Sequence, residues 1–229
     1  GALIPAGMQG IVEFLIENRL IDVIVSTGAN LFHDVHQSLG GAYHHCSPYA
    51  DDKKLREERF DRMYDVAASD REFMQVDDII LRYARTLESR PYGTREFFYG
   101  LGKSIAEISE TSGVVVAAAK ADVPIYCPAV ADSSFGLALA AGRVQDNFLF
   151  TFDLVKDIIE LKTIIEASKE SSEIILGGGT PKNFIQQAAV LFDLTGSIAK
   201  GFRYCVQLTT DAPHWGGLSG CTFEESTSW

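Results

Sequence analysis

The sequence contains little proline, few basic residues and no long apolar run, and each scarcity narrows the choice of function. Proline occurs 7 times in 229 residues while hydrophobic residues make up 46%, which argues against a disordered chain. The 20 Lys+Arg are outnumbered by 31 Asp+Glu, and a net charge of −11 argues against nucleic acid as a partner. Because no stretch approaches the roughly 20 apolar residues of a membrane span, we expect no membrane segment.

Cysteine is also scarce. The sequence has four cysteines, which are far apart and form no C-x-x-C pair: Cys46, Cys127, Cys205 and Cys221. Cys127 and Cys205 lie in apolar, strand-like runs, where cysteine behaves as a small hydrophobic residue. We therefore expect reduced thiols and a cytoplasmic protein. Both ends of the sequence are abrupt, so we expect it to be trimmed from a longer chain.

Short apolar runs alternate with helical periods over most of the chain. The strand-like runs are residues 21–26, 123–127, 148–152, 173–176 and 204–208, and the helical periods are residues 31–39, 135–141, 154–165 and 182–191. This alternation predicts βαβ units. We expect an α/β fold with a Rossmann-like, doubly wound, mainly parallel sheet flanked by helices, in a single domain over residues 1–229.

One segment departs from this pattern. Residues 51–90 are heavily charged, with Leu55, Phe60 and Met63 interspersed. We favour a solvated helical excursion for this segment, and the functional alternative is an arm between subunits.

Small, hydroxylic and acidic residues follow the predicted strands. They are Thr27, Gly28, Asp132, Ser134, Gly177, Gly178, Gly179, Thr209, Thr210 and Asp211. In an open parallel sheet, ligands bind beyond the carboxyl ends of the strands, and these residue types suit close approach to a phosphate and bonding to a ribose hydroxyl. Neither G-x-G-x-x-G nor G-x-x-x-x-G-K-[ST] is present. The run Gly177-Gly178-Gly179 before a helix therefore suits a nucleotide cradle or an ordinary strand-to-helix turn equally well.

Two other clusters admit more than one interpretation. His33, Asp34 and His36, with His44 and His45 nearby, suggest a metal site, but no third ligand has a recognised spacing, so we favour the polar rim of a helix start and expect no metal. His214 and Trp215 stand in a glycine-rich loop that is either exposed or part of a pocket for a flat or cationic ligand. Glu224 and Glu225 indicate either a solvated helix start or an anchor for an amine.

Taken together, five segments resemble the deoxyhypusine synthase family, in its bacterial deoxyhypusine synthase-like branch. They are residues 22–31, 92–103, 127–136, 175–185 and 209–220, in order over nearly the whole chain. The resemblance implies a homotetramer with NAD sites at subunit interfaces and aminobutyl transfer from spermidine or a related polyamine. NAD takes a hydride from an amine carbon, an active-site lysine accepts the aminobutyl group as an imine, and an acceptor amine then displaces it.

The resemblance also implies roles for particular residues. NAD is held by Thr27, Gly28, Asp132, Ser134, Gly177, Gly178 and Thr210, and the amine substrate is bound by Glu225 and Trp229. The family continues after this Ser-Trp pair with Gly-Lys, and that lysine is the catalytic one. We assign its role to no other lysine of the sequence.

Three positions on the side of the site that binds the amine substrate, here called the amine side, depart from the family pattern. Deoxyhypusine synthases carry an acidic residue at the position of Leu137, a histidine at Asn183 and another acidic residue at Leu218. Since spermidine is a polycation, replacing carboxylates by leucine removes attractive groups. Three functions follow as hypotheses: transfer to a lysine of an acceptor protein, transfer between small amines as in homospermidine synthesis, and a non-catalytic NAD-binding scaffold.

Overall fold

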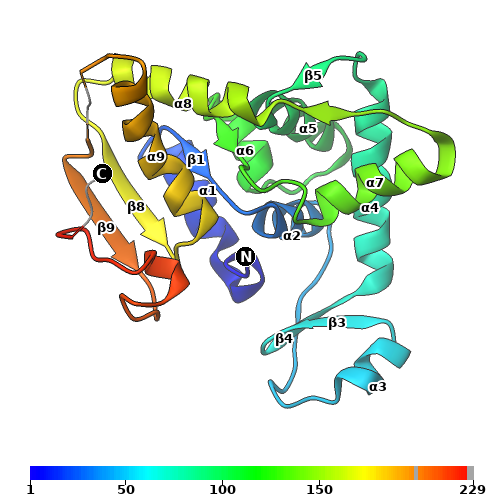
Figure 1. The fold of residues 1–229 in the computed structure, drawn as a ribbon. Coiled ribbons are helices and arrows are strands. Elements are labelled where there is room, and N and C mark those ends of the chain that lie inside the picture. Colours follow the sequence, from blue (N-terminus) through cyan, green and yellow to red (C-terminus); the bar gives the residue numbers. More distant parts are fainter. Residues whose placement is uncertain (199–200, 226–229) are drawn as a thin grey trace. The chain divides into compact units, whose positions relative to one another are not determined.

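The computed structural model describes residues 1–198 and 201–225. The chain divides into two compact units, an N-terminal unit, Gly1–Phe152, and a C-terminal unit, Asp153–Trp229, and each is described by itself (Figure 1). The single domain expected over residues 1–229 stays a prediction. All four cysteines are free thiols. Within the described ranges, each helix is either too short or too polar to cross a bilayer.

The N-terminal unit is mainly helical, with short strands between the helices. After a π-helical turn, Ile4–Met8, it comprises α1 (Gln9–Glu17), β1 (Ile24–Val25), α2 (Gly28–Ser38), β2 (His44–His45), α3 (Asp52–Glu57), β3 (Phe60–Met63), β4 (Val66–Ser69), α4 (Asp70–Thr86), β5 (Pro91–Tyr92), α5 (Thr94–Ile108), α6 (Val114–Ala121), β6 (Ile125–Tyr126), α7 (Ser134–Asp146) and β7 (Thr151–Phe152).

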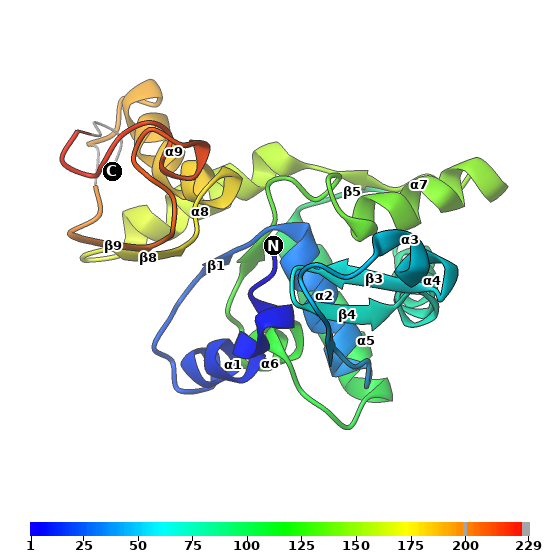
Figure 2. The same cartoon turned by 90° about the horizontal axis from the view of Figure 1, so that it is seen from below.

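The C-terminal unit is a smaller α/β layer. It comprises α8 (Leu154–Ala167), β8 (Ser172–Leu176), α9 (Thr180–Leu194), β9 (Tyr204–Leu208) and a 3-10 turn, Gly216–Leu218. Helix α9 covers one face of the β8–β9 pair (Figure 2), and Glu173 and Ile175 of β8 are buried on that face. Glu173 accepts a hydrogen bond from Gln186 of α9, with 2.9 Å between Oε1 and Nε2.

Parallel pairing, as the alternation of strands and helices predicts, joins three pairs of strands. Strand β1 pairs with β6, β5 with β7, and β8 with β9. An α/β fold is therefore confirmed. The doubly wound sheet is not, because the strands form separate small sheets and not one continuous sheet.

The charged segment 51–90 is helical in part, as we expected, but it also contains strands. It contains helices α3 and α4, but between them β3 and β4 form an antiparallel hairpin, which β2 extends to three strands. Val66, Ala67 and Ala68 of β4 are buried, and Tyr64, with φ 60°, makes the tight turn between β3 and β4. The hairpin lies at one end of the N-terminal unit (Figure 1). The dense charge of the neighbouring residues concealed the two strands in the sequence.

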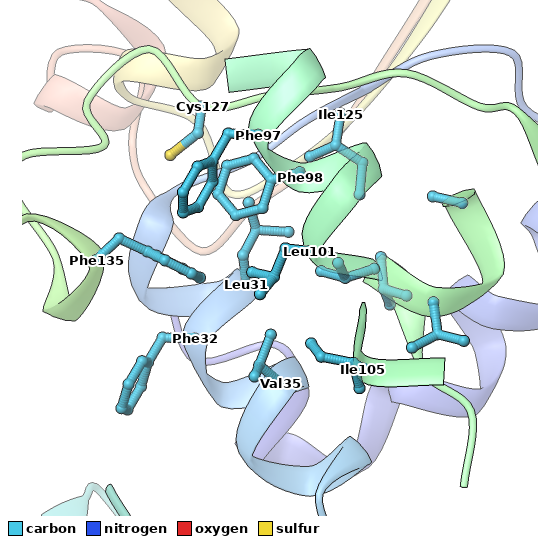
Figure 3. Packing of buried hydrophobic residues seen from close by; sticks show 14 of the residues in the cluster. Leu31, Phe32, Val35, Phe97, Phe98, Leu101, Ile105, Ile125, Cys127 and Phe135 are labelled. Carbon is cyan, nitrogen blue, oxygen red and sulfur yellow. The ribbon is translucent and has the colours of Figure 1, made fainter. Parts of the chain in front are cut away.

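The core of the N-terminal unit packs α2, α5 and α6 together (Figure 3). Its central side chains are Leu31, Phe32, Val35, Phe97, Phe98, Leu101, Ile105, Ile125, Cys127 and Phe135. The Phe135 ring, fully buried in the first turn of α7, meets the Phe98 ring of α5 edge to face with 5.0 Å between centroids. This contact fixes the start of α7 against the core.

A buried carboxylate joins α2 to α6. Asp34 of α2 is completely buried, and its oxygens accept hydrogen bonds from the backbone N–H groups of Val114 and Val115, each at 2.8 Å. The Gln9 side chain donates a third bond to Oδ1 at 2.7 Å. Since Gly113, the residue before α6, has no side chain to cap that helix, Asp34 supplies the cap from 80 residues away. Burial raises the pKa of the Asp34 carboxyl, and the three hydrogen bonds oppose that rise.

We predict that Asp34→Asn destabilises the N-terminal unit by about 2–4 kcal/mol, because one carboxamide cannot accept from both amides and its NH₂ group then faces a buried donor. Urea unfolding monitored by circular dichroism measures the loss. Asp22→Asn, at an exposed position, is the matched control and leaves the free energy of unfolding unchanged. Equal stability of the two variants would refute the capping role.

Candidate functional site

Thr27 and Gly28 stand where β1 passes into α2. Thr27 is the N-cap, and its hydroxyl accepts from the backbone N–H of Asn30 at 3.4 Å. Gly28 is the first helical residue and is buried. The side-chain cap satisfies one amide of the first turn, and the remaining amides of that turn carry the positive end of the helix dipole.

Asp132 and Ser134 stand in the equivalent place after β6. The backbone N–H of Asp132 closes a turn onto the Ala129 carbonyl at 3.0 Å, and the carboxylate side chain is exposed. Ser134 begins α7. The Ser133 hydroxyl donates to the Val130 carbonyl at 2.7 Å and does not cap the helix, so the amides of α7's first turn are not satisfied by this side chain.

The structure brings these two helix starts together. Strands β1 and β6 are parallel neighbours, and the Ser26 N–H continues their pairing onto the Tyr126 carbonyl at 3.0 Å. A Cβ on Gly28 would overlap the Ser133 side chain, so the start of α2 lies directly against the residue between Asp132 and Ser134. Two helix N-termini and one exposed carboxylate therefore share one edge of the N-terminal unit. Such an edge attracts an anion and offers an acceptor for a hydroxyl.

Gly177, Gly178 and Thr210 belong to the C-terminal unit. The Gly177 N–H donates to the Leu208 carbonyl at 2.8 Å, and Gly177 and Gly179 have φ of 87° and 72°, a region that favours glycine. A Cβ on Gly178 would overlap the Gly217 carbonyl oxygen. Thr210, two residues beyond β9, is exposed. The glycine loop is thus a tight turn into α9, packed against the segment that follows β9.

The predicted cofactor residues therefore form two local groups, one in each unit. Thr27, Gly28, Asp132 and Ser134 are together at one edge of the N-terminal unit. Gly177, Gly178 and Thr210 follow the paired strands of the C-terminal unit. The assignment of both groups to NAD stays a prediction.

Glu225 has a local partner. Its Oε2 accepts from the Thr222 backbone N–H at 2.8 Å and from the Thr222 hydroxyl at 2.9 Å, and these bonds lower the pKa of the Glu225 carboxyl. The backbone bond is one half of a capping box, the arrangement expected of a helix start. The role of Glu225 as an amine anchor stays a prediction, and Trp229 lies outside the described residues.

The sequence interpretation missed Lys182. This residue of α9 is only 3% exposed, and its Nζ donates to the Leu218 carbonyl at 3.1 Å. Lys182 and Gln186 are four residues apart on the buried face of α9, and two long polar residues on that face were the signal that could have identified it. Lys182 thereby holds the Gly216–Leu218 turn to the start of α9.

The three positions that depart from the family pattern differ in exposure. Leu137 is 68% exposed on α7, Asn183 is exposed on α9, and Leu218 ends the 3-10 turn half-buried. Each is uncharged, so none of the three provides the electrostatic attraction that a polycationic amine would gain from a carboxylate.

The histidine cluster serves packing. Asp34 is occupied as the cap of α6, and the Tyr43 hydroxyl lies 2.9 Å from His33 Nδ1. His36 Nε2 lies 2.8 Å from Glu72 Oε2. His33 and His36 are 8% and 1% exposed, so the interpretation of these residues as a polar rim was wrong: aromatic neighbours, Phe73 among them, bury them. In residues 1–198 and 201–225, no three His, Cys, Asp or Glu side chains gather to hold a metal ion.

Burial makes the contribution of His33 to protein stability depend on pH. It lowers the pKa of His33 to about 4, with a smaller contribution from His36. Since the unfolded chain takes up this proton near pH 6.5, stability is lost as the pH falls from 6.5 towards 4.

We predict that His33→Gln removes about 2 kcal/mol of the difference in stability between pH 7 and pH 5, because glutamine binds no proton in either state. Denaturant titrations of both proteins at the two pH values measure it. His214→Gln, at an exposed position, is the control. An unchanged pH dependence in His33→Gln would show that His33 titrates normally.

Comparison with known proteins gives one consistent family. A family model described as "Deoxyhypusine synthase" matches residues 1–229. The chain is 44% identical over 230 residues to "Probable deoxyhypusine synthase 2" of Methanosarcina mazei and 43% identical over 229 residues to the protein of the same name from Archaeoglobus fulgidus. It is 37% identical over 233 residues to the "Deoxyhypusine synthase-like protein" of Elusimicrobium minutum.

These matches cover the whole chain but only part of each relative. The chain spans 66% of the Methanosarcina mazei protein, 75% of the Archaeoglobus fulgidus protein and 62% of the Elusimicrobium minutum protein. A crystal structure from Entamoeba histolytica that carries the family's name matches with a TM-score of 0.59 at 20% identity, over 77% of this chain and 55% of that one, which supports the fold. The chain belongs to the deoxyhypusine synthase family.

Proposed function

We propose that this chain is the NAD-binding part of an aminobutyl transferase that acts on spermidine or a related polyamine. The observation that carries the proposal is the shared edge of the N-terminal unit, where α2 and α7 begin side by side after two parallel strands. Membership in the deoxyhypusine synthase family supports the same reaction class, since the relatives bear that name.

The residues at the strand ends fit a dinucleotide. The helix starts at Gly28 and Ser134 offer amides to phosphate oxygens, and the exposed Asp132 carboxylate offers an acceptor to a ribose hydroxyl. In the C-terminal unit, the missing Cβ of Gly178 allows backbone packing that a larger residue would prevent. Thr27, Gly177 and Thr210 complete the proposed NAD contacts.

When bound, NAD would supply a hydride acceptor for the amine carbon and later return the hydride. The chain's own residues would bind and orient the two reactants. Glu225 and Trp229 would hold the amine, and the lysine that forms the imine is expected after Trp229, at the family's Gly-Lys. That lysine must be neutral to attack, a state that burial beside an apolar wall favours.

The assembly and its setting are part of the same proposal. We expect a cytoplasmic homotetramer in which NAD sites lie at subunit interfaces, and a lysine-bearing protein as the acceptor. Each subunit would then contribute the residues that follow its own strands to an NAD site at the interface.

A second function, transfer between small amines, is favoured by the residues on the amine side. Leu137, Asn183 and Leu218 are uncharged where deoxyhypusine synthases carry two acids and a histidine. In a partly buried site, each lost charged hydrogen bond costs about 1.5–3 kcal/mol. A pocket altered in this way suits a different amine donor or acceptor, such as putrescine.

A label-transfer assay distinguishes the candidate functions. The full-length protein is incubated with NAD and spermidine labelled in its aminobutyl group, together with a lysine-bearing acceptor protein or with putrescine. Label on the acceptor protein is the expected result. Labelled homospermidine alone would replace it with the small-amine reaction, and NAD binding without any transfer would indicate a non-catalytic scaffold.

We predict that Asp132→Ala weakens NAD binding about 10- to 100-fold, because the ribose loses a charged acceptor. Isothermal titration calorimetry measures the affinity, and thermal unfolding of the exposed variant is expected to match the parent protein. Asp22→Ala is the matched control. Unchanged affinity in Asp132→Ala would remove this residue from the site.

A further inference from the structure

Gln207 joins the two loops that follow the strands of the C-terminal unit. It lies on β9, one residue before the strand ends at Leu208. Its Nε2 donates to the Gly177 carbonyl at 2.7 Å and to the Gly217 carbonyl at 3.3 Å. One side-chain amide therefore uses both of its N–H groups on two segments that are 40 residues apart in sequence.

These two loops are in close contact beside Gln207. The Gly179 N–H also donates to the Gly217 carbonyl, at 3.3 Å, and the space at Gly178 is too small for a Cβ. Gly217 is similarly enclosed, since a Cβ there would overlap the Asp211 carboxylate. The carbonyl of Gly217 thus receives a backbone donor from one loop and a side-chain donor from β9.

The two loops differ in their assigned roles. The proposed function gives Gly177 and Gly178 to NAD, and the Gly216–Leu218 turn carries Leu218, one of the altered positions on the amine side. We propose that Gln207 is a positioning residue that sets the spacing between the cofactor loop and the amine-side turn. This inference rests on the proposed function for the ligands, and on the hydrogen bonds of Gln207 for the connection itself.

Two variants and one control test the proposal in the full-length protein. Gln207→Leu removes both donors at similar size, and Gln207→Glu keeps the shape while a carboxylate cannot donate to a carbonyl. Gln187→Leu changes an exposed glutamine of α9 in the same way. The first readout is amide hydrogen exchange without NAD, and the second is NAD affinity by calorimetry.

Both Gln207 variants are expected to exchange about tenfold faster at residues 177–180 and 216–220 and to bind NAD about tenfold more weakly, while Gln187→Leu matches the parent protein. If Gln207→Leu fails to fold, Gln207→Glu carries the test. Acceleration spread over α8, β8 and β9 would indicate a general stabilising role and overturn the proposal, as would unchanged exchange in the two loops.

The outcomes distinguish a failure of this inference from a failure of the proposed function. A parent protein that binds no NAD would refute the proposed function, and the exchange data would still decide whether Gln207 joins the loops. A parent protein that binds NAD, with Gln207 variants of equal affinity, would refute the positioning role alone.

Discussion

Parallel hydrogen bonding between β1 and β6 is the constraint on which the candidate site depends. Parallel neighbours direct their carboxyl ends to the same edge, so the segments that follow them meet there although the paired residues, such as Ile24 and Ile125, are 101 apart in sequence. Each segment then begins a helix, and Gly28 lies against Ser133 where the helices start. The same rule in β8 and β9 places the glycine loop beside the Gly216–Leu218 turn. The direction of the paired strands therefore determines which residues meet at each edge.

Buried contacts distant from these edges keep the helices in place. Asp34, near the middle of α2, accepts the first amides of α6, and Phe135 inserts the first turn of α7 among the aromatic rings of the core. In the C-terminal unit, Lys182 and Gln207 donate to carbonyls of one turn, Leu218 and Gly217. Polar side chains thus fix loops whose own residues, largely glycine, have no side chain with which to pack. Rigid support of this kind is what a binding loop requires.

Local patterns predicted much of the fold, and long-range pairing set the limit. The apolar runs 173–176 and 204–208 and the glycines between them correspond to β8, β9 and the turn into α9, because periodicity and turn residues act over a few positions. The capping role of Asp34 was missed because its partners, Val114 and Val115, are 80 and 81 residues away in sequence. Gln207 gave no signal, since its acceptors are backbone carbonyls that sequence does not distinguish. The hairpin at residues 60–69 was hidden by flanking charge.

The central proposal is that the edge of the N-terminal unit where α2 and α7 begin binds NAD. Amide hydrogen exchange on the full-length protein, with and without saturating NAD, tests it most directly. The account predicts protection of residues 26–30 and 130–136 in the N-terminal unit. Unchanged exchange in both segments would contradict it.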